Sequence, residues 1–383
     1  MRNFAVRISL LAGAFAIGMG SASADVKIGV VLPLTGPISA LGIPIKKGIE
    51  LMPPEVAGEK VQLIFLDDAS DPSAAVRNAQ KLITDEKVDL LIGGAGTPAA
   101  LAMAAVASRE QVQLISLAPA VYAADNSKWL VTIPSPANLW VGALVRDMKK
   151  KNVKTVAFIG FSDPFGDLCF NALKDVAAKE GLSIVASERF ARSDTSITGQ
   201  ILKIMAAKPD AVFVGGSGTP GALPHITLSE RGYKGPVYNT PGVFMKDFLR
   251  LGGKAVEGAI AATGPVGAFS QLPDGVPSKK VSADFVREFE ARNGVGSWNS
   301  VAAYGYDGSR VIASAIPGAL KKAKPGTPEF RAALRDEIRA QREVVGTSGV
   351  YVFRDGNSYG VDDRAVITVQ IKDGDWKLLD FTK

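Results

Sequence analysis

Two stretches of this chain are near copies of each other: LIGGAGTPAAL at residues 91–101 and FVGGSGTPGAL at residues 213–223. In each copy an apolar run, the pattern of a buried strand, meets two glycines and then a Thr-Pro pair. Threonine is a good helix N-cap, and proline is favoured at the first helical position. Each copy therefore predicts a strand, a tight loop and a helix capped by Thr97 or Thr219, with Pro224 bending or delaying the second helix.

The two copies suggest a protein of two domains with a binding cleft between them. They lie 122 residues apart (219 − 97), which suits two similar domains and is too long for a solenoid repeat. The start of a helix leaves backbone N–H groups unpaired and carries partial positive charge, so it can hold an anion without Lys or Arg. Two such starts predict two half-sites that face each other. The alternative, that Thr97 and Thr219 only cap their own helices, stays open.

Composition and the first residues indicate an exported protein. The chain has 383 residues, 47% hydrophobic and 21% charged, which is enough for two globular domains. Arg2 and Arg7 precede an apolar run at 10–19, and Ala22-Ser23-Ala24 offers small residues for cleavage, so residues 1–24 are expected to be a signal peptide. No later stretch is apolar and long enough to cross a bilayer, so no stable membrane insertion is expected.

Charge and cysteine content exclude further classes. The net charge of +6 becomes +4 (6 − 2) without the two arginines of the signal peptide, and the basic residues are scattered. No basic face with interleaved aromatics is present, so nucleic acid is not expected as a partner. Cys169 is the only cysteine, so no internal disulfide forms. No cofactor is implied, and the cluster Asp67, Asp68 and Asp71 matches no metal-loop spacing; Asp71 with Pro72 instead predicts a helix cap.

The rest of the chain alternates strands with helices, as expected for two doubly wound parallel sheets, in which ligands bind beyond the carboxyl ends of the strands. The chain is expected to cross between two lobes near residues 134–136, 263–265 and 346–349, which together form a three-strand hinge. The first lobe is predicted at 25–137 plus 267–347, and the second at 138–266 plus 348–383.

Several motifs in this order resemble one family. They are IGVVLPLTGP at 28–37, GIEL at 48–51, DDASDPSAAVRNAQKLI at 67–83, VDLLIGGAGTP at 88–98, LISLAP at 114–119 and LGGKAVEG at 251–258. The chain resembles the branched-chain amino-acid type of periplasmic solute-binding protein, which serves ATP-driven importers. The resemblance implies the type I periplasmic binding protein fold, a periplasmic location, an importer permease as partner and a monomer.

The resemblance also implies ligand-binding positions. Thr97 sits where a Ser of the family holds the ligand carboxylate, and Ala120 sits where a Thr grips it, so that only backbone remains there. The Ala118 carbonyl matches an acceptor of the ligand ammonium. Leu41 replaces an aromatic residue, and Phe165 replaces a Tyr. The candidate ligand-binding residues are Leu41, Thr97, Pro98, Ser116, Ala118, Ala120, Phe165, Ser217, Gly218, Thr219, Pro241 and Gly242.

Pro241 is the most informative departure from the family pattern. Amino-acid binders have a Glu near this position to pair with the ammonium, whereas residues 239–244 contain no acid, and the other cleft loops carry little charge besides Asp163. Burying an ammonium without a carboxylate costs several kcal/mol. The residues therefore favour a carboxylate that lacks an α-amino group. A subgroup of the family binds aromatic carboxylates, and an apolar slot for such a ligand is expected from Leu41, Phe161, Phe165 and Phe244, with Tyr306 reaching the cleft or packing in the core.

Other functions remain as alternatives. The ligand can instead be an aliphatic or keto acid, or a branched-chain or hydrophobic amino acid, and the lobes can present it to a sensory receptor rather than to an importer. The chain is not expected to be an enzyme. The copies fit G-x-G-x-x-[AG], but they follow the third strand of each domain rather than the first, and no acid ends the next strand, so a dinucleotide site is not supported. His225, the only histidine, is expected on a helix surface, and Ser217 is not in a nucleophile elbow.

Overall fold

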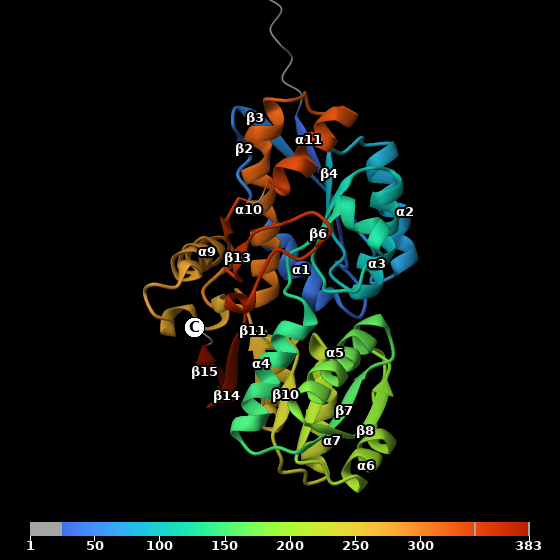
Figure 1. The fold of residues 1–383 in the computed structure, drawn as a ribbon, viewed down its shortest axis with the longest axis vertical. Helices are drawn as coiled ribbons and strands as arrows, with labels where there is room; N and C mark the ends of the chain where they lie inside the picture. The colour runs from blue at the N-terminus through green and yellow to red at the C-terminus, as the bar shows by residue number, and fades with distance from the viewer. Residues whose placement is uncertain (1–24, 341, 382–383) are drawn as a thin grey trace, which may run out of the picture.

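The computed structural model describes residues 25–340 and 342–381, so the signal peptide predicted at 1–24 lies outside the described residues. Two α/β lobes lie one above the other along the long axis of the molecule (Figure 1). None of the helices within the described ranges is long and apolar enough to cross a membrane.

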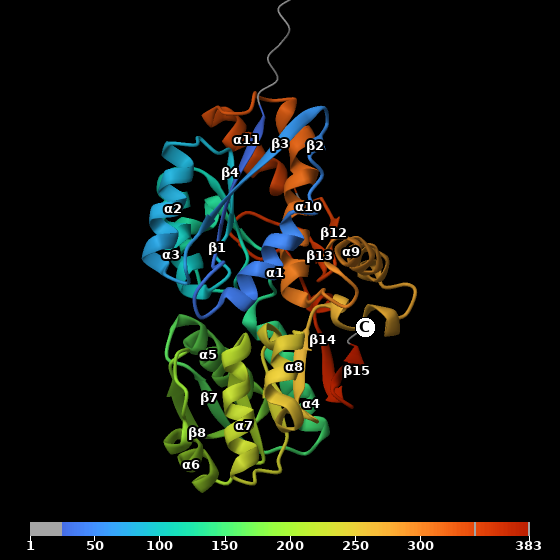
Figure 2. The same ribbon diagram turned by 180° about the vertical axis from the view of Figure 1, so that it is seen from behind.

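The first lobe is built on a six-stranded sheet of order β2-β3-β1-β4-β5-β6, parallel except for the β2–β3 hairpin. Helices α1 and α10 pack against each other on one face, and α2 and α3 on the other (Figure 2). The strands are β1 (Val26–Leu32), β2 (Glu55–Val56), β3 (Glu59–Asp67), β4 (Leu90–Gly93), β5 (Gln113–Ser116) and β6 (Leu130–Thr132). The helices are α1 (Ser39–Ile49), α2 (Pro72–Thr84), α3 (Thr97–Arg109), α10 (Ser300–Leu320) and α11 (Pro328–Ile338).

The second lobe contains a seven-stranded sheet of order β15-β14-β11-β10-β9-β7-β8, in which only β14 and β15 are antiparallel to their neighbours. The strands are β7 (Thr155–Phe161), β8 (Ser183–Phe190), β9 (Ala211–Gly215), β10 (Val237–Asn239), β11 (Ile260–Thr263), β14 (Ile367–Lys372) and β15 (Asp375–Phe381). The helices are α4 (Ala137–Lys150), α5 (Pro164–Glu180), α6 (Thr198–Ala206), α7 (Leu223–Glu230) and α8 (Lys246–Gly252). Two doubly wound lobes are the predicted type I fold.

Aspartates begin helix α2, which follows β3 in the first lobe, and helix α5, which follows β7 in the second lobe. The Asp71 carboxylate accepts from the backbone N–H groups of Ser73 and Ala74 at the start of α2, which confirms that predicted cap. Asp163 accepts in the same way from Phe165 and Gly166 at the start of α5. These caps fix where each helix begins at the cleft edge of its sheet.

A buried carboxylate ties helix α10 to the late part of the chain near β12 (Val344–Val345) and β13 (Val350–Tyr351). Asp307 accepts from the backbone N–H groups of Thr347 and Ser348, from the Thr347 hydroxyl and from the Tyr351 hydroxyl. The predicted lobe boundaries stay a prediction. After residue 348 the chain contacts the first lobe before it reaches the second: the Tyr359 hydroxyl donates to the Ala120 carbonyl, and β14 then joins the sheet of the second lobe.

Candidate functional site

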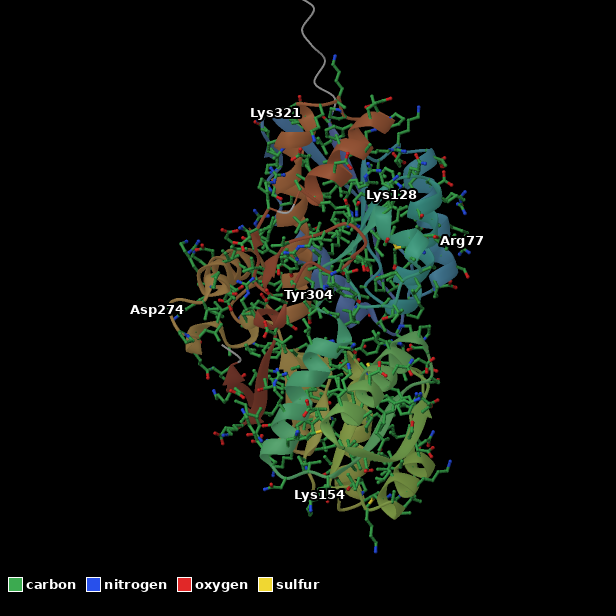
Figure 3. All side chains as sticks on the ribbon, in the orientation of Figure 1. Arg77, Lys128, Lys154, Asp274, Tyr304 and Lys321 are labelled. Carbon is green, nitrogen blue, oxygen red and sulfur yellow. The ribbon has the colours of Figure 1, made fainter. Side chains whose placement is uncertain are left out.

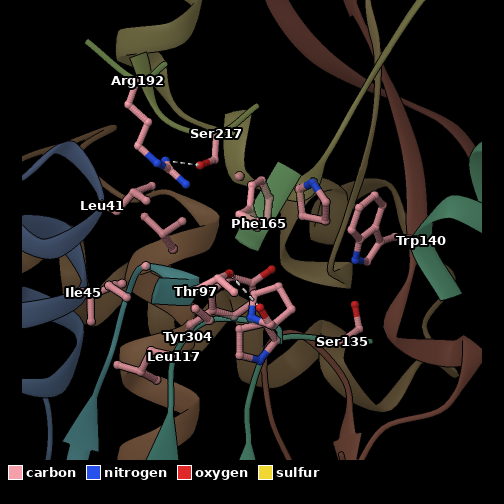
Figure 4. Close-up of a pocket in the computed structure, with 18 residues that line it drawn as sticks. Leu41, Ile45, Thr97, Leu117, Ser135, Trp140, Phe165, Arg192, Ser217 and Tyr304 are labelled. Atoms are coloured by element: carbon pink, nitrogen blue, oxygen red, sulfur yellow. Dashed lines mark hydrogen bonds between the residues drawn. The ribbon is translucent and has the colours of Figure 1, made fainter. Parts of the chain in front are cut away.

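A cavity lies between the lobes, where the carboxyl ends of both sets of parallel strands meet. The space between its lining atoms is about 610 Å³, which includes the part that is open to solvent at the mouth. The first lobe contributes residues that follow β1, β4 and β5, and the second lobe contributes residues that follow β7, β8, β9 and β10. This is the place where open parallel sheets bind ligands. The lining is Leu41, Ile45, Ala95, Gly96, Thr97, Leu117, Ala118, Pro119, Pro134, Ser135, Trp140, Phe165, Arg192, Ser217, Pro241, Gly242, Val301 and Tyr304 (Figure 4).

The duplicated loops both reach this cavity, but their threonines do not cap helices. Helix α3 begins at Thr97 with Gly96 in the N-cap position, and the Thr97 hydroxyl donates to the Pro119 carbonyl at 2.8 Å. In the second copy a 3₁₀ turn, η2 (Thr219–Ala222), precedes α7, and Gly218 occupies its N-cap position. The delay predicted from Pro224 is confirmed, whereas the predicted Thr caps are wrong. Thr97 instead joins the loop after β4 to the loop after β5.

Polar groups of the loop after β5 are hydrogen-bonded to other protein groups. Ser116 is buried outside the cavity lining, and its hydroxyl donates to the Ala118 carbonyl at 3.1 Å. The Tyr122 hydroxyl donates to the same carbonyl, so this acceptor already has two donors. The Ala120 N–H donates to the Tyr359 hydroxyl at 3.0 Å, and Ala120 does not line the cavity. The backbone N–H expected there to meet a carboxylate is therefore occupied.

The second lobe places a cation at the cavity. Arg192 follows β8, and its Nε donates to Asp163 Oδ2 at 2.6 Å. Its Nη1 donates to the Ser217 hydroxyl at 3.3 Å, as Figure 4 shows. The guanidinium lies 4.0 Å from the centroid of the Phe161 ring, which is fully buried beneath it. Its side chain is 17% exposed, so the guanidinium is largely removed from water, and the Asp163 carboxylate beside it offsets part of its charge.

Charge in the cavity is one-sided. Among the described residues, Arg192 is the one cation of the lining, and no aspartate or glutamate lines it. Asp163 is held against Arg192 and opens onto a neighbouring cavity, which also contains Pro98. The arrangement offers hydrogen-bond donors for an anion and no carboxylate partner for an ammonium.

The apolar slot differs in composition from the expected one. Leu41 and Phe165 line the cavity as predicted, but Phe161 lies under Arg192. Phe244 lies outside the lining and stacks on Trp376 with ring centroids 5.0 Å apart, so neither of these two phenylalanines is available to a ligand in the cavity. Of the second-lobe loops, Ser217, Pro241 and Gly242 line the cavity, whereas Gly218 and Thr219 do not.

Two aromatic side chains of the cavity were not predicted. Trp140 comes from the first turns of α4, directly after the chain leaves the first lobe, and it is 1% exposed. Tyr304 of α10 lines the cavity, whereas Tyr306, two residues later, packs on Phe285. Burial raises the pKa of Tyr304, so its hydroxyl stays protonated.

Arg192 is the functional residue that sequence reasoning missed most clearly. It follows β8 in the second lobe, as Asp68 follows β3 in the first lobe. The rule that ligands bind beyond strand ends was sufficient to find it, but no motif marks the stretch around it.

His225 is buried rather than on a helix surface, which corrects the expectation. It is 2% exposed, and its Nε2 lies 2.8 Å from Asn239 Oδ1. Burial lowers the pKa of the ring to about 4, so the imidazole is neutral at physiological pH. Within the described residues, no group of three or more His, Cys, Asp or Glu side chains is gathered to hold a metal ion.

Comparison with known proteins agrees with this architecture. A family model described as periplasmic binding protein matches residues 25–375. Leu/Ile/Val-binding protein homolog 3 of Brucella melitensis is 27% identical over 268 residues, which are 66% of this chain and 71% of that one. A solved structure of an extracellular ligand-binding receptor from Rhodopseudomonas palustris is 42% identical, with a TM-score of 0.92 over 94% of this chain and 100% of that chain. The leucine-binding protein LivK from Thermotoga maritima is 25% identical, with a TM-score of 0.81 over 93% of this chain and 98% of that chain. The chain belongs to the periplasmic binding protein family, whose members are extracytoplasmic solute-binding proteins, and it is similar to members that are named for binding Leu, Ile and Val.

Proposed function

We propose that this protein is the periplasmic solute-binding component of an ABC importer, and that it binds a small carboxylate without an α-amino group, with an aromatic acid preferred. The observation that carries the proposal is the charge of the cavity: Arg192 lines it, and within the described chain no acidic residue does. An α-ammonium buried there would lose its hydration without gaining a carboxylate, at a cost of several kcal/mol.

The carboxylate of the ligand is expected to lie between the two lobes. Arg192 supplies charge-assisted donors from the second lobe, namely the guanidinium N–H groups that remain after its bonds to Asp163 and Ser217. From the first lobe, the start of α3 at Thr97 supplies a favourable dipole, which adds to the cation without replacing it.

The body of the ligand is expected to contact rings. Trp140, Phe165 and Tyr304 line the cavity together with the aliphatic side chains of Leu41 and Val301. Aromatic pairs contribute about 0.5–1.5 kcal/mol each beyond their buried area, which favours a planar ring over an aliphatic chain of equal size.

Both lobes supply contacts, so the ligand is expected to select a closed arrangement. Only a form with the lobes together makes the Thr97 side and the Arg192 side of the site at once. Closure about the crossings between the lobes would exclude water and create the surface that the importer permease recognises. The protein is expected to act as a monomer after its signal peptide is removed near Ala24. A sensory receptor in place of the permease would use the same closure.

Branched-chain amino acids are the second candidate, because relatives of this chain are named Leu/Ile/Val-binding proteins. Matched ligand pairs separate the candidates by changing one group at a time. The first pair is benzoate with benzamide, and the second is leucine with its 2-keto acid. Protein refolded to remove carried-over ligand would be measured by thermal shift and by calorimetry with each compound.

The proposal predicts that benzoate raises the melting temperature and benzamide does not, and that the keto acid binds better than leucine. A ligand at a hundred times its Kd stabilises the native state by about 2.7 kcal/mol, which is readily measured. Tight binding of leucine without binding of any aromatic acid would contradict the proposal and favour the second candidate.

A further inference from the structure

A second cavity lies beside the ligand cavity and is also shared by the two lobes. The two cavities have Gly96 and Arg192 in common. The first lobe contributes Asp68 and Ser70, which follow β3, and the second contributes residues that follow β7 and β8. Any change in the angle between the lobes therefore changes the separation of the groups that face each other here.

Asp68 brings an incompletely paired carboxylate to this second cavity. The side chain is 1% exposed, and its Oδ1 accepts from the Ser70 N–H at 2.9 Å. Its Oδ2 is buried and has no hydrogen-bond partner among the described residues. An unsatisfied buried acceptor costs about 1–3 kcal/mol, and more when it is charged, so this oxygen gains from any donor that approaches it.

The cationic donor that the opposite lobe brings to this cavity is the guanidinium that the ligand site uses. Arg192 spends Nε on Asp163 and Nη1 on Ser217, and Nη2 is its remaining nitrogen. Asp163 and the rings of Phe161 and Phe165 hold the group in place from its own lobe. An acceptor in need of a donor and a cation thus line one cavity from opposite lobes.

We propose that Asp68 is a positioning residue for Arg192: as the lobes close, Asp68 Oδ2 accepts from Nη2 of Arg192, and this ion pair holds the closed form with the guanidinium aimed at the ligand. The proposal rests on the closure described under the proposed function, and it adds a residue that the ligand does not touch. Asp68 would then set the affinity through the population of the closed form.

Protonation should control this pair. Burial, and then the charges of Asp67 and Asp71 on the same loop, raise the pKa of Asp68 to about 6. The charged groups that face it from the second lobe are Arg192 and Asp163. Only the ionised carboxylate attracts the guanidinium strongly. The ion pair should therefore weaken as the pH falls toward the pKa of Asp68, which is about 6 while the carboxylate is not paired with Arg192.

The first experiment measures closure without requiring a known ligand. Donor and acceptor dyes on cysteines at Arg77 and Lys154, both exposed and on different lobes, report the distance between the lobes by energy transfer (Figure 3). Cys169 is fully buried and should not be labelled. Asp68→Asn keeps the size and the Ser70 acceptor, Asp68→Glu keeps the charge, and Asp175→Asn repeats the substitution at an exposed aspartate of α5.

We expect wild-type protein at pH 8 to be more closed than at pH 5, and Asp68→Asn to be as open at pH 8 as wild type at pH 5. Asp175→Asn should follow wild type, and Asp68→Glu should recover part of the pH dependence. Equal closure of wild type and Asp68→Asn across this pH range would overturn the proposal, whatever the ligand.

The second experiment uses benzoate as the probe, with Kd measured by calorimetry from pH 5 to pH 8. Asp68→Asn should weaken binding about tenfold at pH 8 and remove the pH dependence. The ligand-free melting temperature at pH 8 should not fall, because the variant no longer buries a charge; a merely structural role predicts that stability and affinity fall together. If wild type does not bind benzoate, the proposed function fails, and the closure measurement still decides the role of Asp68.

Discussion

Replacing Arg192 by methionine tests the central feature of the ligand site. Methionine keeps an apolar stem that can cover Phe161, but it removes every guanidinium donor. Hydrogen bonds to charged groups contribute about 1.5–3 kcal/mol each, and each 1.4 kcal/mol is about tenfold in affinity. If the ligand carboxylate takes one such bond from Arg192, Arg192→Met should weaken benzoate binding by about 10- to 150-fold.

The variant should fold, because the site keeps its other supports. Asp163 loses its cation but still accepts from the backbone of Phe165 and Gly166 at the start of α5. Arg189→Met is the matched control: this guanidinium lies over Phe158 and Phe170 at 4.6 and 4.8 Å and is outside the cavity lining. It should bind benzoate like wild type.

Calorimetry with benzoate and benzamide separates charge from shape. We expect Arg192→Met to lose most of the preference for benzoate over benzamide, since the remaining contacts do not distinguish them. Unchanged benzoate affinity in Arg192→Met would refute the assignment of Arg192 as the carboxylate partner. An equal loss of affinity for both compounds would mean that the side chain shapes the cavity but does not distinguish a charged ligand from a neutral one.

Further predictions concern one more residue of the cavity and two buried residues outside it. Pro241→Glu should add the missing ammonium partner and create leucine binding detectable by calorimetry; a folded variant that still ignores leucine would show that this position does not face the amino group. The depressed pKa of His225 stabilises the fold above pH 6.5, and this stability is lost as the pH falls toward 4, by about 3 kcal/mol in all. Urea titrations at several pH values should show that the unfolding free energy of His225→Gln lacks this fall between pH 6.5 and pH 4. The same fall in the variant as in wild type would contradict the prediction. Asp307→Asn should lower the unfolding free energy by about 2–4 kcal/mol, because an amide cannot accept all the donors that surround the carboxylate, and loss below about 1 kcal/mol would mean that the network is dispensable.

Strong local patterns made much of the fold predictable. The apolar runs at β1 and β4 can only be buried, and Asp71-Pro72 marks the start of α2 unambiguously. Thr97 and Thr219 show the limit of that approach. Cap preference is a local property, but Thr97 donates to the carbonyl of Pro119, which is distant in the sequence. The two residues meet only because the loops after β4 and β5 lie side by side where these neighbouring strands end.

The candidate site was less predictable, because side-chain direction decides it. Tyr304 and Tyr306 are both on α10, but two residues turn a helix by about 200°, so only one faces the cavity. Arg192 lies in an irregular stretch without periodicity, where no pattern predicts direction. The absence of an acidic residue near Pro241 could be predicted from the sequence, because it depends only on which residues are present and not on where their side chains point.

The last described strands, β14 and β15, form a hairpin that pairs with a strand from much earlier in the chain. Strand β14 pairs with β11, about a hundred residues earlier in the chain, and β15 covers the outer edge of β14 (Figure 1). During synthesis the edge of β11 therefore stays open until the chain has grown by about another hundred residues and β14 has been made. Open edges recruit other chains, and contacts distant in sequence form slowly. A chain truncated before Asp375 should retain the ligand cavity residues yet aggregate through β14, because β15 would no longer cover the outer edge of that strand.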